Sequence, residues 1–322
     1  MAEYYIGIDL GGTNIKAGVV DRDGRSHSRV SLTTEGRSGY EGVVQRIAEA
    51  ARRAAREAQI ELSAVRGVCL ASPGVITIAT GVVHVSPNLP GWSEVPLAGD
   101  VGQVLGRRVI LENDANAAAW GEFWVGAGRD VDSMVILTLG TGVGGGIVLN
   151  GRLWHGAQDS AGEIGHMIIK EGGRRCGCGR LGCLEAYGSV TAMCGRLAEA
   201  IQAGESSSLT AAVHAGTACT GREICDAAVA GDPLAERIMR ETGYYLGVGL
   251  VNICHVLNPE RVVLTGGMTA AGDRILAPIR QTVRKMAFAA MSEKMEIVFA
   301  ALGEDAGYIG AAGMAILADE KE

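Results

Sequence analysis

Three cysteines and a histidine lie close together in the segment HMIIKEGGRRCGCGRLGC. Cys176, Cys178 and Cys183 fall within eight positions, and His166 lies ten residues before the first of them. Three thiolates and one imidazole make a complete tetrahedral ligand set for zinc, which is how structural zinc sites are usually closed. The intervening glycines let a short backbone fold tightly around an ion. The spacing therefore predicts a structural zinc site.

Two other roles for these cysteines stay open, a redox pair and unreactive structural thiols. The N-terminal residues MAEYYIGIDL lack the basic stretch and apolar run of a secretory signal, so we expect a cytoplasmic protein. Clustered cysteines in a cytosolic protein bind metal or do redox chemistry more often than they form disulfides. The remaining cysteines show no framework spacing: Cys69, Cys194, Cys219, Cys225 and Cys254. Metal binding is therefore the favoured interpretation.

Three glycine turns follow apolar strands, and backbone N–H groups in such turns can bind phosphate. They are Gly11-Gly12-Thr13, Gly140-Thr141-Gly142 and Gly266-Gly267. None matches a Walker A loop. The residues GIVLNG after the second turn read as a strand, which argues against a dinucleotide fingerprint. Each turn alone is more often ordinary turn chemistry, but three in order favour phosphate binding.

Phosphoryl transfer also needs a base that orients the attacking hydroxyl. The segment LENDAN offers Asp114, at the end of a strand where a helix should begin. The alternative is that Asp114 merely caps that helix. Without context the cap is the favoured interpretation, although one residue can do both.

The composition limits the classes of partner. The 322 residues include 29 Lys and Arg and 36 Asp and Glu, which gives a formal charge of −7. This net negative charge gives no overall electrostatic support for a surface that binds nucleic acid. No apolar stretch is long enough to span a bilayer. The 48 glycines are about twice the usual share. We therefore expect a globular protein with small-molecule partners and no nucleic-acid or membrane partner.

The elements that would position these residues alternate between strands and helices, which predicts an α/β protein. The strand, glycine turn and second strand of residues 4–24 recur at 135–151, a period of 129 residues. This recurrence suggests two related domains. The alternative is that any two glycine-rich hairpins look alike.

The other elements are read from periodicity and caps. Asp232 as N-cap and Pro233 at the first helical position predict the start of a long helix. We also expect helices over 40–59, 189–203, 221–230 and 306–318, and one that begins at or after Asp114. Strands are expected near 65–71, 108–112 and 295–300, and a strand, glycine turn and helix in ERVVLTGGMTAAGDRILAPIRQTVRKM.

Several segments together resemble the ROK family of sugar kinases, repressors and open reading frames. They are IDLGGTNIKAGVVD, ENDANAAAWGE, LGTGVGGGIVLNG, GEIGH and CGCGRLGCLE, in this order between about Tyr5 and Gly310. The cysteine segment is the most specific of them. The resemblance implies an actin-like ATPase (ribonuclease H-like) fold with two duplicated α/β domains around a cleft. It places residues 1–115 and 306–322 in a smaller domain and 116–305 in a larger one with the zinc loop 166–183.

The resemblance implies ATP-dependent phosphorylation of a hexose at its 6-hydroxyl, with Asp114 as catalytic base and with Mg²⁺ and structural Zn²⁺ as cofactors. Glucose is the expected sugar; N-acetylglucosamine, N-acetylmannosamine and fructose are the alternatives. The implied ATP and phosphate residues are Asp9 (near Mg²⁺), Gly11, Gly12, Thr13, Gly140, Thr141, Gly142, Gly144, Gly266 and Gly267. The implied sugar-binding residues are Gly74, Asn88, Asn113, Asp114, Glu163, His166 and Glu185.

The same resemblance implies a homodimer or homotetramer, and it links the zinc loop to the sugar. One nitrogen of His166 can bind zinc while the other binds a sugar hydroxyl. In EAYGSV, Val190 stands where kinases of this family often have Gly, just beyond Glu185, which bears on sugar preference. Repressors of the family carry a helix-turn-helix segment before the core. The first strand begins near Tyr4, so we expect an enzyme rather than a repressor, and the zinc loop disfavours a filament or chaperone ATPase.

Overall fold

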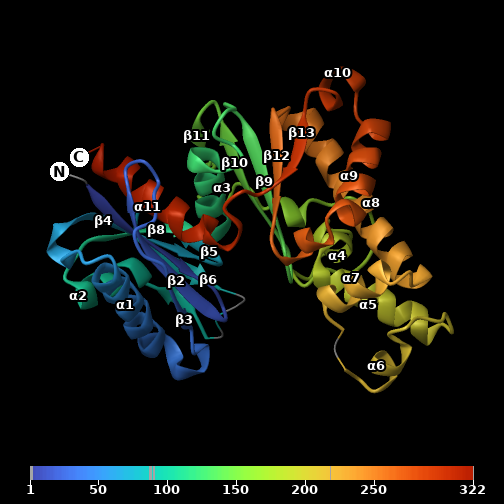
Figure 1. The fold of residues 1–322 in the computed structure, drawn as a ribbon, viewed down its shortest axis with the longest axis horizontal. Coiled ribbons are helices and arrows are strands. Elements are labelled where there is room, and N and C mark those ends of the chain that lie inside the picture. The colour runs from blue at the N-terminus through green and yellow to red at the C-terminus, as the bar shows by residue number, and fades with distance from the viewer. Residues whose placement is uncertain (1–2, 87–88, 90, 218, 322) are drawn as a thin grey trace. The chain divides into compact units, whose positions relative to one another are not determined.

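The computed structural model describes residues 3–86, 89, 91–217 and 219–321 (Figure 1). It contains two compact α/β units. Unit 1 comprises Met1–Asp132, Gly146–Gly162 and Ala300–Glu322, and unit 2 comprises Ser133–Gly145 and Glu163–Phe299. Within the described residues no helix combines the length and the apolar character that a membrane span requires.

Unit 1 is built on a five-stranded sheet with the order β3-β2-β1-β4-β8. Strand β2 pairs antiparallel with both β1 and β3, whereas β1, β4 and β8 run parallel. The expected strand–turn–strand opening and the two following strands are confirmed. The strands are β1 (Tyr4–Leu10), β2 (Asn14–Asp21), β3 (Val30–Thr33), β4 (Val65–Ser72) and β8 (Val109–Asn113).

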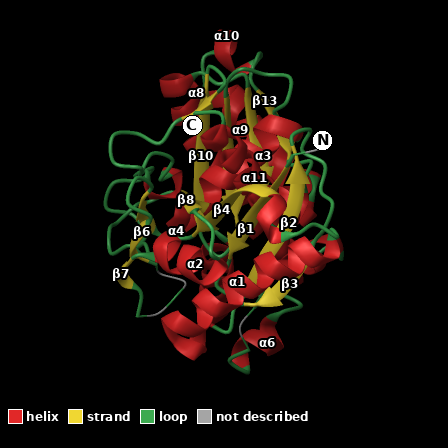
Figure 2. Cartoon of the chain, turned by 90° about the vertical axis from the view of Figure 1, so that its left-hand side faces the viewer, coloured by secondary structure: helices red, strands yellow, loops and turns green. Residues whose placement is uncertain are grey.

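Helices cover both faces of this sheet, because successive side chains of a strand point to opposite faces. Ile6 and Ile8 of β1 pack in the core that contains α1 (Gly39–Glu57), which confirms the helix expected at 40–59. Tyr5 packs in the core that contains α11 (Ala306–Asp319). Figure 1 shows the two helices on opposite faces, and Figure 2 shows helices flanking the strands.

Helix α3 (Asp114–Val125) packs directly on α11 because glycines leave room for close approach. A Cβ on Gly310 would lie 1.7 Å from the carbonyl oxygen of Ala117, and one on Gly121 would lie 2.5 Å from that of Ala306. This packing puts α3 in unit 1, although the sequence interpretation began the second domain at residue 116. Residues 146–162 and 300–305 also fall in unit 1 rather than in the predicted larger domain.

A fully buried carboxylate, Glu122 of α3, binds the backbone on either side of this contact. Its Oε2 accepts N–H groups of Ala127 at 2.8 Å and Ala301 at 3.0 Å, and its Oε1 accepts that of Leu302 at 2.8 Å. These bonds satisfy backbone groups that would otherwise be costly to bury. The carboxylate thus joins the end of α3 to the segment that leads into α11.

Unit 1 also holds a small antiparallel sheet and a helix that the sequence interpretation did not include. The sheet has the order β5-β6-β7. Its strands span only three or four residues, too few to show a period. The elements are β5 (Val75–Thr77), β6 (Val82–Val85), β7 (Ser93–Val95) and α2 (Leu97–Leu105).

The second five-stranded sheet has the order β11-β10-β9-β12-β13, and the unit boundary falls within β10. In both sheets the second strand along the chain pairs with the first, and the fourth and fifth continue on the other side. Strands β9, β12 and β13 run parallel. The matching order confirms the predicted duplication. The strands are β9 (Met134–Leu139), β10 (Val143–Leu149), β11 (Arg152–Leu153), β12 (Arg261–Thr265) and β13 (Glu296–Phe299).

Helix α8 (Pro233–Leu257) begins as its sequence predicts, with the Asp232 side chain accepting N–H bonds from Leu234 and Ala235, both at 3.0 Å. It packs on α9 (Asp273–Met286). The expected helices α5 (Val190–Gln202) and α7 (Gly221–Val229) are also confirmed. The sequence interpretation did not include the short helices α4 (Glu185–Gly188), α6 (Thr210–His214) and α10 (Ala289–Ser292).

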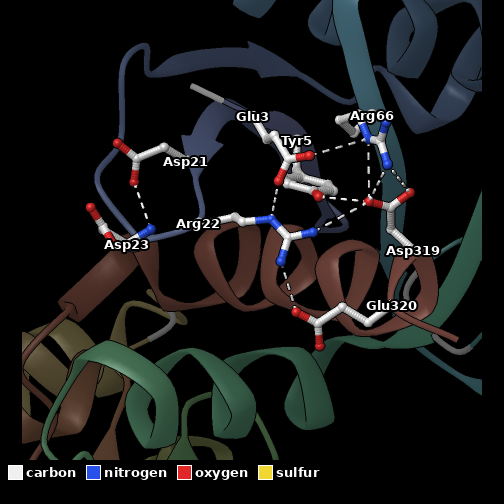
Figure 3. A network of polar contacts seen from close by, with 8 residues as sticks. All are labelled: Glu3, Tyr5, Asp21, Arg22, Asp23, Arg66, Asp319 and Glu320. Atoms are coloured by element: carbon white, nitrogen blue, oxygen red, sulfur yellow. Dashed lines mark hydrogen bonds and ion pairs between the residues drawn. The ribbon is translucent and has the colours of Figure 1, made fainter. Parts of the chain in front are cut away.

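A polar network fastens the end of α11 to the sheet of unit 1 (Figure 3). The Tyr5 hydroxyl donates to Asp319 Oδ2 at 2.8 Å, and Arg66 binds the same carboxylate at 3.2 Å. Arg22 pairs with Glu3 and, at 2.9 Å, with Glu320. The ion pairs of Arg22 and Arg66 are partly exposed and individually weak, but together the network joins β1, β4 and the residue after β2 to the end of the last helix.

Candidate active site and metal centre

The polar residues of unit 1 gather where its parallel strands end. Asp9 lies near the end of β1, Gly74 follows β4, and Asn113 ends β8. Ligands of open α/β sheets bind at the carboxyl ends of such strands. The Asn113 amide donates to the Gly74 carbonyl at 3.5 Å. Gly74 has φ of 112° and lies against Val85, whose carbonyl oxygen would be 2.2 Å from an added Cβ, so this turn requires glycine.

Asp114 opens α3, and the helix cap is its neighbour. Asn113 Oδ1 accepts N–H bonds from Ala115 at 2.9 Å and from Asn116 at 3.1 Å, which is the N-cap arrangement. The alternative interpretation of Asp114 as the cap is therefore wrong. The Asp114 carboxylate stands half-buried at the start of the helix, with its Oδ1 accepting the Ala115 N–H at 2.9 Å.

Asp9 and Asp114 interact through their charges. Burial, together with the negative charge of Asp114, raises the pKa of Asp9 to about 7, and Lys16 acts in the opposite direction. Lys16 lies opposite Asp9 on β2. Gly307 at the start of α11 leaves space for this carboxylate, because an added Cβ would lie 2.5 Å from Asp9 Oδ2. Two carboxylates placed so favour a cation between or beside them.

The buried Glu112 and the half-buried His155 support the junction of β8 and α3, where Asn113 and Asp114 lie. Glu112 Oε1 accepts the Asn113 N–H at 2.9 Å and the Asn116 amide at 3.2 Å. Glu112 Oε2 lies 2.8 Å from His155 Nε2, and this hydrogen bond raises the pKa of His155. The sequence interpretation missed this pair, because 43 residues separate the partners and no local pattern connects them.

Hydrogen bonds fix the backbone of the first glycine turn, and the tip of the turn is exposed to solvent. The Gly11 N–H donates to the Asn14 carbonyl at 2.9 Å, and the Thr34 hydroxyl donates to the Gly11 carbonyl at 2.6 Å. Gly12 and Thr13 are exposed. Such a turn can present backbone N–H groups to an anion. Asn88, which the resemblance implied for the sugar, lies outside the described residues.

The second and third turns lie side by side in unit 2. Strands β9 and β12 pair in parallel with Thr138 opposite Thr265, so the turns that follow them meet at one sheet edge. Gly266 has φ of 98°, and an added Cβ would lie 2.5 Å from the Leu139 carbonyl oxygen. Glycine is therefore required at this position for both conformation and space. Gly144 lies inside β10, beyond the second turn.

The four predicted metal ligands converge. The ligand atoms of His166, Cys176, Cys178 and Cys183 all lie within 4.8 Å of one another. The Cys178 and Cys183 sulfurs are 3.7 Å apart, and Cys176 Sγ is 3.8 Å from His166 Nδ1. Tetrahedral zinc with Zn–S near 2.3 Å and Zn–N near 2.1 Å requires about 3.8 Å between sulfurs and about 3.6 Å between sulfur and nitrogen. The donor set and its spacing fit zinc.

The thiols of this cluster differ in acidity. The backbone N–H of Arg180 lowers the pKa of Cys178 to about 7, whereas burial raises the pKa of Cys176 to about 12. Burial also raises the pKa of Cys183. Because metal ligands must be deprotonated, a bound cation would favour the thiolate form of all three.

Glu163 and Glu185 lie beside the cysteine cluster. Glu163 Oε2 is 3.8 Å from His166 Nε2, the ring nitrogen that does not face the cysteines. Glu185 Oε2 accepts the Val143 N–H at 3.0 Å, and its Oε1 lies 3.4 Å from Cys176 Sγ. Glu163 therefore lies near His166, and Glu185 lies between Cys176 and the end of the second glycine turn.

Comparison with known proteins identifies the family of this chain. A model of the ROK family matches residues 5–318. The chain belongs to the ROK family. The chain is 37% identical over 308 residues to a glucokinase of Halalkalibacterium halodurans, which covers 95% of this chain and 93% of that protein. It is 37% identical over 309 residues to a glucokinase of Thermotoga maritima, with 96% of each covered.

A solved structure of a ROK family glucokinase from Streptomyces griseus, in complex with glucose and AMPPNP, matches with a TM-score of 0.82. It is 35% identical and covers 98% of this chain and 99% of that chain. The predicted actin-like ATPase fold of ROK kinases is thereby confirmed. In this ROK chain, unit 1 carries Asp9, the first turn, Asn113 and Asp114, and unit 2 carries the other two turns and the cysteine cluster.

Proposed function

We propose that this protein transfers the γ-phosphoryl group of ATP to the 6-hydroxyl of glucose. Its relatives over nearly the full length are glucokinases, and the similar Streptomyces griseus structure holds glucose and AMPPNP, an ATP analogue. The observation that carries the proposal in this chain is the pair formed by Asp114 at the start of α3 and Asp9 at the end of β1.

In the proposed reaction, Asp114 accepts the proton of the 6-hydroxyl while that oxygen bonds to the γ-phosphorus. The bond from the γ-phosphorus to its bridging oxygen breaks, and ADP leaves. Mg²⁺ bound with ATP offsets the phosphate charge. We assign Asp9 to the side of the magnesium, where a nearby cation would favour its charged form.

The three glycine turns are proposed to hold the nucleotide. The first offers Gly11, Gly12 and Thr13, and its tip is exposed. Backbone donors suit phosphates because they are fixed in place and need no side-chain ordering. The residues that we propose in unit 2 are Gly140, Thr141, Gly142, Gly144, Gly266 and Gly267.

Carboxylates and amides around the sugar would bind its hydroxyls. We propose as sugar-binding residues Gly74, Asn88, Asn113, Asp114, Glu163, His166 and Glu185. His166 Nδ1 faces the cysteines, so Nε2 is the nitrogen left for a hydroxyl. Zn²⁺ on Nδ1 would fix the tautomer that carries a proton on Nε2. The zinc is then structural, since four protein ligands complete its shell.

A sugar panel tests the proposal. Purified protein with Mg²⁺ and ATP is assayed for ADP release with glucose, mannose, fructose, N-acetylglucosamine and N-acetylmannosamine. We expect the highest kcat/KM with glucose. A preference for an N-acetyl sugar would retain the reaction and refute glucose as substrate. No turnover with any sugar, from folded protein that contains zinc, would refute the proposed function.

A further inference from the structure

Hydrogen bonds from two residues shortly after the cysteine cluster hold the second glycine turn. The Val190 N–H donates to the Gly140 carbonyl at 2.9 Å, and the Thr191 hydroxyl donates to the Thr141 carbonyl at 2.8 Å. Both donors lie in the first turn of α5. The position at which this chain has Val190 is thus a contact with the proposed phosphate turn.

Glu185 makes the third contact, and it fits into a space that glycine provides. Its Oε2 accepts the Val143 N–H at 3.0 Å. A Cβ on Gly142 would lie 2.4 Å from that same oxygen. The carbonyl side of Val143 is also covered, because a Cβ on Gly165 would lie 2.0 Å from the Val143 carbonyl oxygen. The backbone at the end of the turn is therefore enclosed between Glu185 and the residue that precedes His166.

The same carboxylate reaches the metal ligands. Glu185 Oε1 lies 3.4 Å from Cys176 Sγ, and Glu185 follows Cys183 by two residues. Four bonds to one ion would fix the backbone on both sides of the cysteine loop. An ion at this site would therefore fix Glu185, and Glu185 would in turn fix the Val143 N–H. Unit 2 alone contains all of these contacts.

We propose that Glu185 is a positioning residue that couples the metal site to the second glycine turn, so that bound zinc raises the affinity for the phosphates of the nucleotide. This inference rests on the proposed function, because it takes the turn as a nucleotide site. It differs from the sugar role of Glu185 in that it acts without any sugar. Coupling between two sites in proteins is typically about 5- to 150-fold in affinity.

The test measures the dissociation constant of AMPPNP with Mg²⁺ and without sugar. Zinc-loaded protein is compared with protein stripped by a chelator, whose fold is checked by circular dichroism. We expect zinc removal to weaken AMPPNP binding about tenfold. In Glu185→Ala, zinc content should be retained, since Glu185 is not among the four ligands. AMPPNP binding by this variant should be weak with or without zinc, because the connection is lost.

Two further variants separate coupling from general damage. Glu185→Gln keeps an oxygen that can accept the Val143 N–H, so it should restore most of the affinity and its dependence on zinc. The exposed Glu171 lies on the same cysteine loop, and Glu171→Ala should behave as wild type. If the stripped protein unfolds, zinc affinity is measured instead with and without AMPPNP. Because coupling is reciprocal, AMPPNP should tighten zinc binding by the same factor, and only when Glu185 is present.

The outcomes distinguish this inference from the proposed function. Equal AMPPNP affinity in loaded and stripped wild type, or the same zinc effect in Glu185→Ala, would overturn the coupling and leave the kinase proposal standing. Where zinc affinity is measured instead, an affinity that does not change with saturating AMPPNP would overturn the coupling. If zinc-loaded wild type binds no AMPPNP at all, both the proposed function and the inference are refuted.

Discussion

Replacing Asp9 with asparagine should stabilise the protein at neutral pH, because the surroundings of Asp9 in the folded state disfavour its charged form. Burial and the charge of Asp114 raise the pKa of Asp9 from 3.8 to about 7. Between these two values the folded state binds more protons than the unfolded state. The free energy of unfolding of the wild type therefore falls as the pH rises through this range.

The size of the effect follows from the shift. About three pKa units at about 1.4 kcal/mol each give about 4 kcal/mol at pH 8. This is an upper limit, because Asp9 is partly exposed to solvent and its charge is partly screened. At pH 4.5 the same linkage leaves about 1 kcal/mol. Asparagine does not titrate, so Asp9→Asn should gain the larger amount at pH 8 and the smaller at pH 4.5.

Urea unfolding without Mg²⁺ at the two pH values measures this difference. Asp23→Asn, at an exposed aspartate in the turn after β2, is the matched control and should change little. The reasoning is refuted if Asp9→Asn is no more stable than wild type at pH 8, or if its gain is the same at both pH values.

Three other substitutions test separate parts of the account. Asp114→Asn should keep glucose binding by calorimetry and lower kcat at least about 100-fold, since the amide cannot accept the proton; wild-type turnover would remove Asp114 from the mechanism. Cys178→Ser should lose zinc by metal analysis and weaken glucose binding, and full zinc with unchanged affinity would contradict the structural-metal assignment. Glu122→Gln should lower the free energy of unfolding by about 1–3 kcal/mol, because an amide NH₂ would face backbone N–H groups; unchanged urea unfolding would contradict this.

The sequence predicts the fold where local chemistry is decisive. Asp232 and Pro233 mark the start of α8 because capping acts over three residues. The repeated strand–turn–strand segment indicates the duplication because each copy is contiguous. The strands β5 to β7 escaped prediction because their pairing, rather than their own sequence, defines them. The domain boundary at 115 differs from the compact units because α3 packs on α11, a contact between segments almost 200 residues apart.

For the candidate site too, the sequence predicts some features and not others. The cysteine cluster is readable because its ligands fall within one segment, and the structure brings them together. The support of Asp114 is not readable, since Glu112 reaches His155 from a distant segment. Likewise, no pattern in the sequence shows that Gly142 is small because the Glu185 carboxylate occupies the adjacent space. Tertiary contacts decide these features, and one sequence carries no local signal for them.

The central claim is that this chain phosphorylates glucose at its 6-hydroxyl. The most direct measurement incubates zinc-containing protein with glucose, ATP and Mg²⁺ and identifies the product by phosphorus NMR and mass spectrometry. The account predicts glucose 6-phosphate and ADP in equal amounts, and no such product from Asp114→Asn over the same time. Phosphate on another hydroxyl, or no phosphorylated sugar from folded wild-type protein, would contradict it.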